Sequence, residues 1–215
     1  MFEEAFSSET KQLLRKVAPV VSAQQFYLAG GTGLALQVGH RISQNLHFFK
    51  KESFDASRLL SSLRDRVGSV KEIVIEVGTL LAGLDEIRCS FLLYGVPLLF
   101  KAPPFCGVKV ANWRDITAEK IKTISHRRSK RDFCDVFSVA RSGRLTIKEL
   151  VSLFRRRFEP TRINLYHVLR SLNYFEEAQE EPDPMVIGDL GFSWSDVVSF
   201  FRSNIGDLER YFGKT

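Results

Sequence analysis

The stretch that decides the fold is FYLAGGTGLALQVGHRISQNLHFF, residues 26–49. A short apolar run leads into Gly30-Gly31-Thr32, an amphipathic segment follows, and a second short apolar run ends the stretch. Two adjacent glycines let the backbone adopt angles that a side chain forbids and approach a ligand closely. A helix that begins here offers unpaired N–H groups and a partial positive charge to an anion. The stretch therefore predicts a strand, a phosphate-binding turn in which Thr32 adds a hydroxyl, a helix and a second strand.

The same tripeptide has a simpler interpretation, in which Gly30-Gly31 is only a tight strand-to-helix turn and Thr32 is the N-cap of the helix. The continuation into RISQNLHFF favours the functional interpretation. Alternate side chains of a strand point to one face, so Asn45 and His47 would face a ligand held by the turn.

Beyond this stretch the chain divides into two parts by its hydrophobic pattern. Strand-like and helical segments alternate first, and from residue 115 onwards only helical periodicity remains. We expect helices at 9–18, 32–39, 55–67, 116–125, 131–140, 146–158, 164–175 and 193–201, and strands at 25–29, 46–49, 72–81, 87–94 and 108–110. The pattern predicts an α+β fold with a domain at 1–112 and a helical domain at 113–215.

Composition limits the class of protein. Of 215 residues, 44% are hydrophobic, which is ample for a buried core, and no apolar run approaches the ~20 residues of a membrane span. Three widely spaced cysteines and an N-terminus unlike a signal peptide predict a reduced, cytoplasmic protein. The net charge of +6 is uneven, with basic runs at 126–131 and 155–157 and an acidic run at 176–183. We expect the run at 155–157 to be a solvated surface.

Residues 26–49 closely resemble the first motif of the AbiEii/AbiGii toxin family, whose members have a minimal nucleotidyltransferase fold of the polymerase-β type. The resemblance implies a mixed sheet with flanking helices, followed by a helical domain that completes the ligand cleft. In that family the second strand carries Asp-x-Asp, which holds two metal ions. Here the two positions are Asn45 and His47, a neutral carbonyl oxygen and a nitrogen donor that suit Mg²⁺ poorly. We expect weak or absent metal binding there, with Mg²⁺ or Mn²⁺ bound alongside a nucleoside triphosphate only if the chain is active.

Two further positions bear on the metal site. Ser90 stands where the family resemblance places a third carboxylate on a neighbouring strand, and Glu76 is a candidate substitute whose direction the sequence leaves open. His47 could also be an ordinary half-buried strand histidine without a role in metal binding, which is the commoner situation.

Two later segments, DITAEK and SHRRSKRDFCD, resemble the later motifs of the same family. The resemblance implies that Lys120 contacts a triphosphate and that Lys130 or Arg131 adds positive potential. It also implies that Asp132 and Asp135 orient these groups or assist catalysis. A lysine beside a helix-start phosphate site is a sensible triphosphate clamp.

Simpler explanations exist for these residues too. Lys120 could lie on a solvated helix face, Asp132 could be a first-turn acid favoured by the helix dipole, and Asp135 could pair with Arg131 at i,i+4. The first motif, upstream and in the expected order, favours the functional interpretation. The site keeps its cations, Arg41 among them, and has lost two anions. We therefore predict nucleotide or anion binding that depends little on Mg²⁺.

The resemblance extends to the C-terminal segments NLYHVLR and LNYFEEA, where Tyr166, His167 and Tyr174 are expected to pack helices together. It implies transfer of a nucleoside monophosphate from a triphosphate to an acceptor such as tRNA. The setting would be toxin–antitoxin or phage defence, with a cognate antitoxin or regulator as partner. Because both motif aspartates are replaced, the sequence leaves enzymatic activity open. The alternative is a catalytically inactive homologue that binds nucleotide, RNA or a protein partner, and basic runs at 126–131 and 155–157 could attract RNA phosphates.

Overall fold

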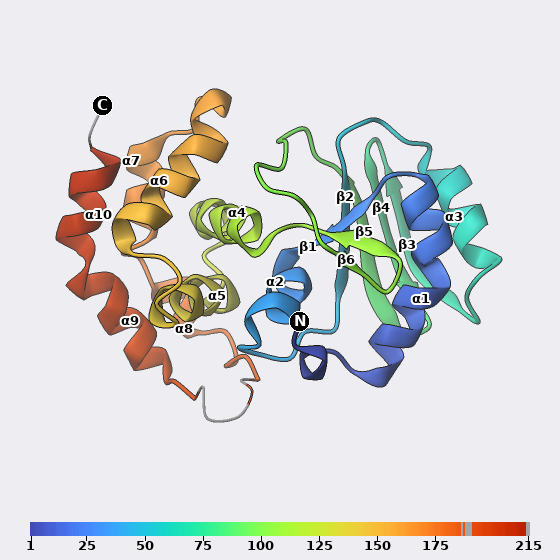
Figure 1. Ribbon diagram of the computed structural model, residues 1–215, viewed down its shortest axis with the longest axis horizontal. Coiled ribbons are helices and arrows are strands. Elements are labelled where there is room, and N and C mark those ends of the chain that lie inside the picture. Colours follow the sequence, from blue (N-terminus) through green and yellow to red (C-terminus); the bar gives the residue numbers. More distant parts are fainter. Residues whose placement is uncertain (186, 188–190, 214–215) are drawn as a thin grey trace.

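The computed structural model describes residues 1–185, 187 and 191–213, and these residues form two parts with separate hydrophobic cores (Figure 1). One core lies among strands and helices between Ala5 and Val110, and the other lies among helices between Ala118 and Phe212. The expected α+β fold, a mixed sheet with flanking helices followed by helices alone, is confirmed. Among the described residues, no helix has the length and apolar character needed to span a membrane.

Within the described residues seven strands form one sheet in the order β3-β4-β5-β2-β1-β7-β6. They are β1 (Tyr27–Ala29), β2 (Leu46–Lys50), β3 (Val70–Glu76), β4 (Thr79–Leu84), β5 (Ile87–Leu93), β6 (Pro104–Phe105) and β7 (Val108–Val110). β1 runs antiparallel to β2 and parallel to β7, and β2 runs parallel to β5. The two strands of the diagnostic stretch therefore lie side by side at the middle of the sheet.

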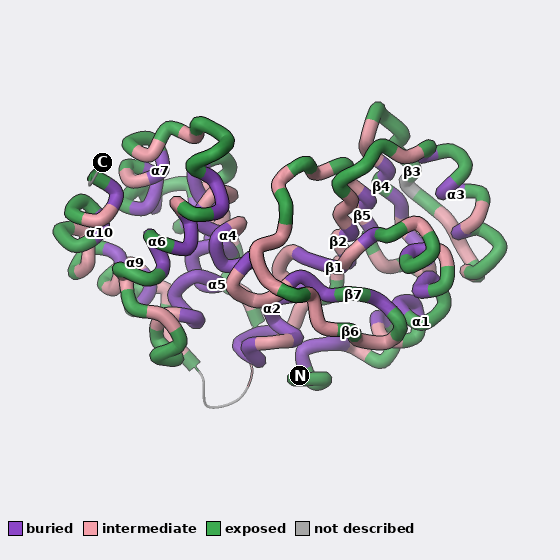
Figure 2. The backbone as a smooth tube through the Cα atoms, turned by 45° about the horizontal axis from the view of Figure 1, so that its top comes forward, coloured by how far each residue is buried: buried purple, intermediate pink, exposed green. Residues whose placement is uncertain are grey.

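The two faces of the sheet are covered differently (Figure 1). α1 (Ser8–Ala23) and α3 (Ala56–Arg64) pack on one face, where Phe48 and Phe91 stack with ring centroids 5.0 Å apart. α2 (Gly30–Val38) and α4 (Trp113–Arg127) lie between the sheet and the helical part. Figure 2 shows that β1, α2, α4 and α5 carry much of the buried backbone, so the junction of the two parts is an interior region.

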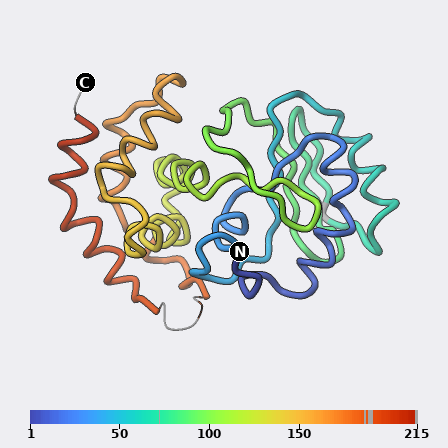
Figure 3. The backbone as a smooth tube through the Cα atoms, viewed as in Figure 1, coloured from blue at the N-terminus to red at the C-terminus, as the bar shows by residue number. Residues whose placement is uncertain are grey.

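The helical part follows α4 (Figure 3). It contains α5 (Lys130–Arg141), α6 (Ile147–Phe158), α7 (Leu165–Ser171), α8 (Glu176–Gln179), α9 (Trp194–Ser203) and α10 (Ile205–Phe212). Its core is rich in aromatic contacts, such as the edge-on packing of Phe133 against Phe201. α5 is buried along much of its length, and together with α4 it packs against α2, so these two helices join the helical part to the sheet part.

Several expected boundaries were wrong. The run at 72–81 is two strands, because Gly78, at φ +71°, allows the chain to reverse between β3 and β4. α1 continues through Pro19 to Ala23, since its buried apolar face extends to Val21. The helix expected at 164–175 ends at Ser171. The sequence analysis did not predict β6 or α10.

Candidate active site

The glycine turn lies where the sequence placed it, at the junction of β1 and α2. Gly30 has φ +67°, and a Cβ added there would lie 2.9 Å from the His47 ring. A Cβ added to Gly31 would lie 2.1 Å from a guanidinium nitrogen of Arg41. Such separations are too short for real atoms, so both positions require glycine because two predicted site residues pack against them.

Thr32 occupies a different environment from the one expected. It is fully buried, and its hydroxyl donates to the backbone carbonyl of Asn45 and hydrogen bonds to the Ser43 hydroxyl at 2.7 Å. It is not the helix N-cap either, because α2 begins at Gly30 with Ala29 in that position. Thr32 therefore fixes α2 to the loop that leads into β2.

A buried charged cluster joins the two parts of the chain. We use this name for His40, Arg41, Lys120, Arg127, Asp132 and Asp135. Its centre is the Asp135 carboxylate, which is fully buried and accepts from Arg41 Nε at 2.7 Å and Arg41 Nη2 at 3.1 Å. Lys120 Nζ lies 2.7 Å from Asp135 Oδ2. The interactions link the loop after α2 to α4 and α5, and they differ from the expected local pair between Asp135 and Arg131.

Asp132 is the second anion of the charged cluster. Its carboxylate accepts from Lys120 Nζ at 2.6 Å, Arg127 Nε at 2.7 Å and Arg127 Nη2 at 2.9 Å. Lys120 is therefore buried between two carboxylates and does not lie on a solvated helix face. The side chain of Arg127 is 60% exposed, so it can meet a ligand while it holds Asp132.

The charges of the cluster follow from this geometry. Burial alone would raise the pKa of Asp135, but Arg41 and Lys120 outweigh burial and hold that pKa well below its usual range. Asp132 behaves similarly, with its pKa lowered by Lys120 and Arg127 against the effect of burial. Burial lowers the pKa of His40, whose Nε2–H donates to Asp135 at 2.7 Å as a neutral ring. Three cations thus face two carboxylates, and the cluster keeps one positive charge in excess.

His47 lies on β2 between two cross-strand neighbours, Ala29 on β1 and Ser90 on β5. Burial, followed by Lys120 and Arg127, lowers the pKa of His47 to about 4. The ring is neutral at pH 7 and lies beside the cations of the cluster. Glu76 lies three strands away, opposite Thr79 on β4, which at ~4.8 Å a strand is about 14 Å from β2. The structure therefore does not bring Glu76 to the site as a third carboxylate.

The residues present do not fit a pair of divalent metal ions of the kind that the fold resemblance implies. Asn45, His47 and Ser90 offer only neutral donors, whereas Mg²⁺ prefers anionic oxygen ligands. The nearby carboxylates of Asp132 and Asp135 are already bonded to lysine and arginine side chains. No group of three or more His, Cys, Asp or Glu residues among those the structure describes could hold a metal ion.

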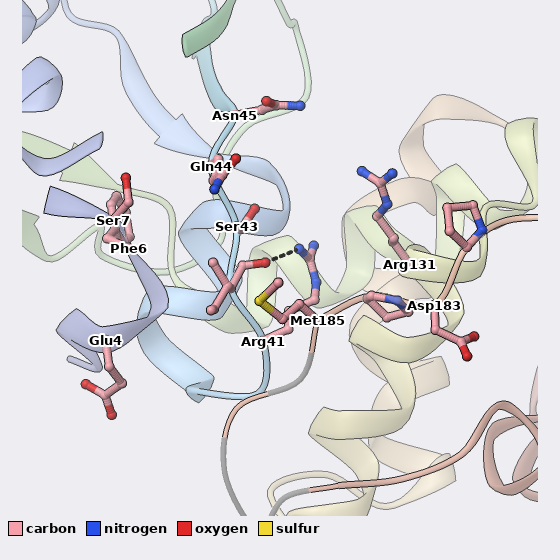
Figure 4. A pocket seen from close by; sticks show the side chains of 13 residues that line it. Glu4, Phe6, Ser7, Arg41, Ser43, Gln44, Asn45, Arg131, Asp183 and Met185 are labelled. Carbon is pink, nitrogen blue, oxygen red and sulfur yellow. Dashed lines mark hydrogen bonds between the residues drawn. The ribbon is translucent and has the colours of Figure 1, made fainter. Parts of the chain in front are cut away.

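A pocket of about 440 Å³ adjoins the charged cluster (Figure 4). Arg41, Asn45 and Arg131 line it, and these are the predicted site residues that the pocket brings together. Figure 4 shows the loop before β2 on one side and Arg131 of α5 on the other. Within the described chain Arg131 has no hydrogen-bond or ion-pair partner, so its guanidinium is available to an anion in the pocket.

Lys130 lies apart from the cluster cations. It is buried, its Nζ lies 3.1 Å from Asp183 Oδ1, and it sits over the Trp194 ring. Its backbone N–H and the Ser129 hydroxyl both donate to Glu181. Lys130 thus fastens the acidic run to the start of α5.

The expectation that 155–157 is a solvated surface was wrong for Arg157. That side chain is 3% exposed and is ion-paired to Asp115, whose carboxylate also accepts from the backbone N–H groups of Leu99 and Phe100. Arg156 is exposed, as expected. The difference arises because α6 has a buried face that includes position 157.

Sequence reasoning missed two members of the charged cluster, His40 and Arg127. The sequence position of each residue indicated that it lies near the site, because His40 directly precedes Arg41 and Arg127 lies in the basic run before Asp132. Nothing local showed that His40 and Asp135, 95 residues apart, would meet.

The "Uncharacterized protein aq_aa25" of Aquifex aeolicus (strain VF5) is 32% identical over 201 residues, which cover 92% of this chain and 94% of the relative. The chain belongs to the aq_aa25 family. A comparison with protein-family models finds no match, so the specific AbiEii/AbiGii membership is a proposal.

Solved structures resemble this member of the aq_aa25 family over nearly its whole length. JHP933 from Helicobacter pylori has a TM-score of 0.53 and 14% identity, with 95% of each chain covered. MenT4, a nucleotidyltransferase toxin from Mycobacterium tuberculosis H37Rv, has a TM-score of 0.53 and 14% identity, covering 96% of this chain and 89% of MenT4. At such identities the likeness shows the fold alone. The chain has a nucleotidyltransferase fold.

Proposed function

We propose that this protein binds a nucleoside triphosphate at the glycine turn, with the phosphates held by cations of the charged cluster instead of by a pair of metal ions. The observation that supports the proposal is the excess of cations at Gly30-Gly31 on a nucleotidyltransferase fold. Arg41 lies against Gly31, and Lys120 and Arg127 act on the adjacent His47. Fixed cations beside unpaired helix-start N–H groups favour a phosphate chain.

The wider role that we propose is that of a nucleotidyltransferase-like protein of the AbiEii toxin kind. The reaction would be transfer of a nucleoside monophosphate to an acceptor such as tRNA, with a cognate antitoxin or regulator as partner. The similarity in fold to MenT4, a nucleotidyltransferase toxin, supports this class of activity. The two-metal mechanism is impaired because neutral side chains, those of Asn45, His47 and Ser90, stand where carboxylates would bind the metal ions. Nucleotide binding is therefore the part of the proposal with the most support.

Calorimetric titration with each nucleoside triphosphate, with and without Mg²⁺, tests the proposal. The natural protein is expected to bind at least one triphosphate with micromolar affinity that changes little when Mg²⁺ is removed. Asn45→Asp/His47→Asp adds two carboxylates beside the same cations. That variant is expected to lose binding without metal, because the added anions repel the triphosphate, and to regain it with Mg²⁺.

Asn164→Asp/His167→Asp is a matched control, because it makes the same two changes on α7, away from the glycine turn. It is expected to bind as the natural protein does. Arg131→Gln removes an exposed pocket cation and is expected to weaken binding without affecting folding. Failure of every triphosphate to bind, or binding only with Mg²⁺, would contradict the proposal.

One surface favours a second candidate, binding of RNA without nucleotide transfer. A groove of about 620 Å³ is lined by Arg128 of the basic run, by α7 and the residues that follow it, and by α10. In it Arg128 lies over the Tyr174 ring at 5.0 Å and Arg170 over the Tyr166 ring at 6.0 Å. Tyr166 is 69% exposed and Tyr174 is 38% exposed, so the expectation that these tyrosines pack the helices together was wrong. Exposed aromatic rings beside arginines suit unstacked bases.

Fluorescence anisotropy with a single-stranded oligoribonucleotide tests this second candidate. Tyr166→Ala/Tyr174→Ala is expected to weaken binding by about 1–3 kcal/mol for each base that loses a stacking partner. The salt slope should stay nearly the same, because no cation is removed. If the variant and the natural protein bind equally, and the affinity falls steeply with salt concentration, the interaction is electrostatic alone and the tyrosines do not stack on bases.

A further inference from the structure

His47 is a half-buried side chain at the centre of the site whose ring nitrogens have no described partner. Its ring packs against Gly30, at the start of α2 where the phosphates are proposed to bind. On the sheet its neighbours are Ala29 and Ser90, which make no side-chain hydrogen bond to it in the part of the chain that the structure describes. The imidazole is therefore held in place by packing while its nitrogens stay available to a ligand.

The electrostatic surroundings keep this imidazole unprotonated. Burial is the largest cause that lowers the pKa of His47. The positive charges of Lys120, Arg127 and Arg41 lower it further, and the negative charge of Asp132 raises it. A neutral imidazole has a free nitrogen lone pair and can act as a nucleophile without first losing a proton. A triphosphate bound by the same cations would offset their charge and make the ring more basic than it is in the free protein.

We propose that His47 is the first acceptor of the nucleotide, so that one ring nitrogen takes the nucleoside monophosphate and forms a nucleotidyl-histidine. This inference rests on the nucleotide binding proposed above. The nitrogen lone pair forms a bond to the α-phosphorus, and the bond from that phosphorus to the α–β bridging oxygen breaks. The bridging oxygen leaves with its electron pair as part of pyrophosphate. The second ring nitrogen releases its proton to pyrophosphate or water.

The arrangement replaces the two tasks that metal ions perform in this type of reaction, which are to activate a hydroxyl nucleophile and to stabilise the leaving group. A neutral imidazole needs no such activation. The charge of the departing pyrophosphate is met by Lys120, Arg41 and the largely exposed Arg127. Attack on the phosphoramidate by an acceptor hydroxyl or water would then return His47 to its starting state.

The test uses the intact protein, a nucleoside triphosphate labelled at the α-phosphate, and a chelator that removes divalent metal. Label is expected to stay on the denatured protein, to be lost in acid and kept in base, and to map by mass spectrometry to the peptide that contains His47. His47→Gln is expected to abolish the label, and calorimetry is expected to show that this variant still binds the nucleotide. His126→Gln, an exposed histidine outside the site, should label as the natural protein does.

A γ-labelled triphosphate should leave no label, which distinguishes nucleotidyl transfer from phosphorylation. Nucleotide binding without any α-label would overturn this inference and leave the proposed function standing. Label that persists in His47→Gln would also overturn it, because another residue would be the acceptor. Absence of nucleotide binding would overturn both proposals together.

Discussion

Replacement of Asp135 by Asn is expected to lower the free energy of unfolding by about 3–5 kcal/mol. The carboxylate is fully buried and bonded to Arg41, Lys120 and His40. A neutral amide of the same size leaves the buried Arg41 guanidinium without an anion and leaves Lys120 with Asp132 alone. The loss therefore comes from unpaired charge and not from a cavity. Urea unfolding at neutral pH measures the difference.

The control for this substitution is Glu177→Gln, which breaks the exposed ion pair with Arg128. Exposed pairs contribute about 0–1 kcal/mol, so a similar loss in both variants would contradict the importance that we assign to burial.

The pH dependence provides a second check on Asp135. Its folded pKa is lowered, whereas an unfolded Asp has a pKa of about 3.9. The stabilisation is therefore fully present above about pH 4 and is lost as pH falls through the lower, folded pKa. Asp132 shifts in the same direction. The Asp135→Asn variant should lose less stability than the natural protein over this acid range.

Arg157→Leu is the second substitution with a large expected effect, a loss of about 3 kcal/mol or more. Arg157 Nη1 bonds to Asp115 and to the Pro97 carbonyl at 3.0 Å, and Nη2 lies 3.6 Å from Glu119. Its removal leaves the Asp115 carboxylate buried without a cation. The two backbone N–H groups that still reach Asp115 limit the loss. Thermal or urea unfolding measures the change.

Arg156→Leu is the matched control, since Arg156 is the exposed neighbour on the same helix, and its change is expected to stay within about 0.5 kcal/mol. The double variant Asp115→Asn/Arg157→Leu should lose less than the sum of the two single variants, because it leaves no buried unpaired charge. Strict additivity would show that the two side chains stabilise the fold independently.

The parts of the fold that the sequence predicted correctly depend on local rules. Gly30-Gly31 marks a strand-to-helix turn because glycine alone tolerates the positive φ and the close approach of His47 and Arg41. The alternation of strand and helix segments gave the fold class for a similar reason, since periodicity reports which face of each element is buried. The run at 72–81 failed because its β-branched residues continue up to a glycine that reverses the chain.

The charged cluster depends on contacts that no local rule contains. Lys120 and Asp132 were predicted as site residues, but two partners of Asp135, His40 and Arg41, come from a loop some 95 residues away. Tyr166 and Arg157 show the same limit for single helix positions. Tyr166 was expected to be buried and is exposed, whereas Arg157 was expected to be exposed and is buried. In each case tertiary packing of the helix decided which face is buried.

The position of Asp135 has a consequence for motion. The residue belongs to α5, while two of its partners, His40 and Arg41, belong to the loop between α2 and β2. A hinge that separated the two parts would have to pull these buried charges apart, at a cost comparable to that of unfolding a marginal domain. The two parts should therefore move as one rigid body, and ligands would have to fit the pocket beside Arg41 and Arg131 as it stands.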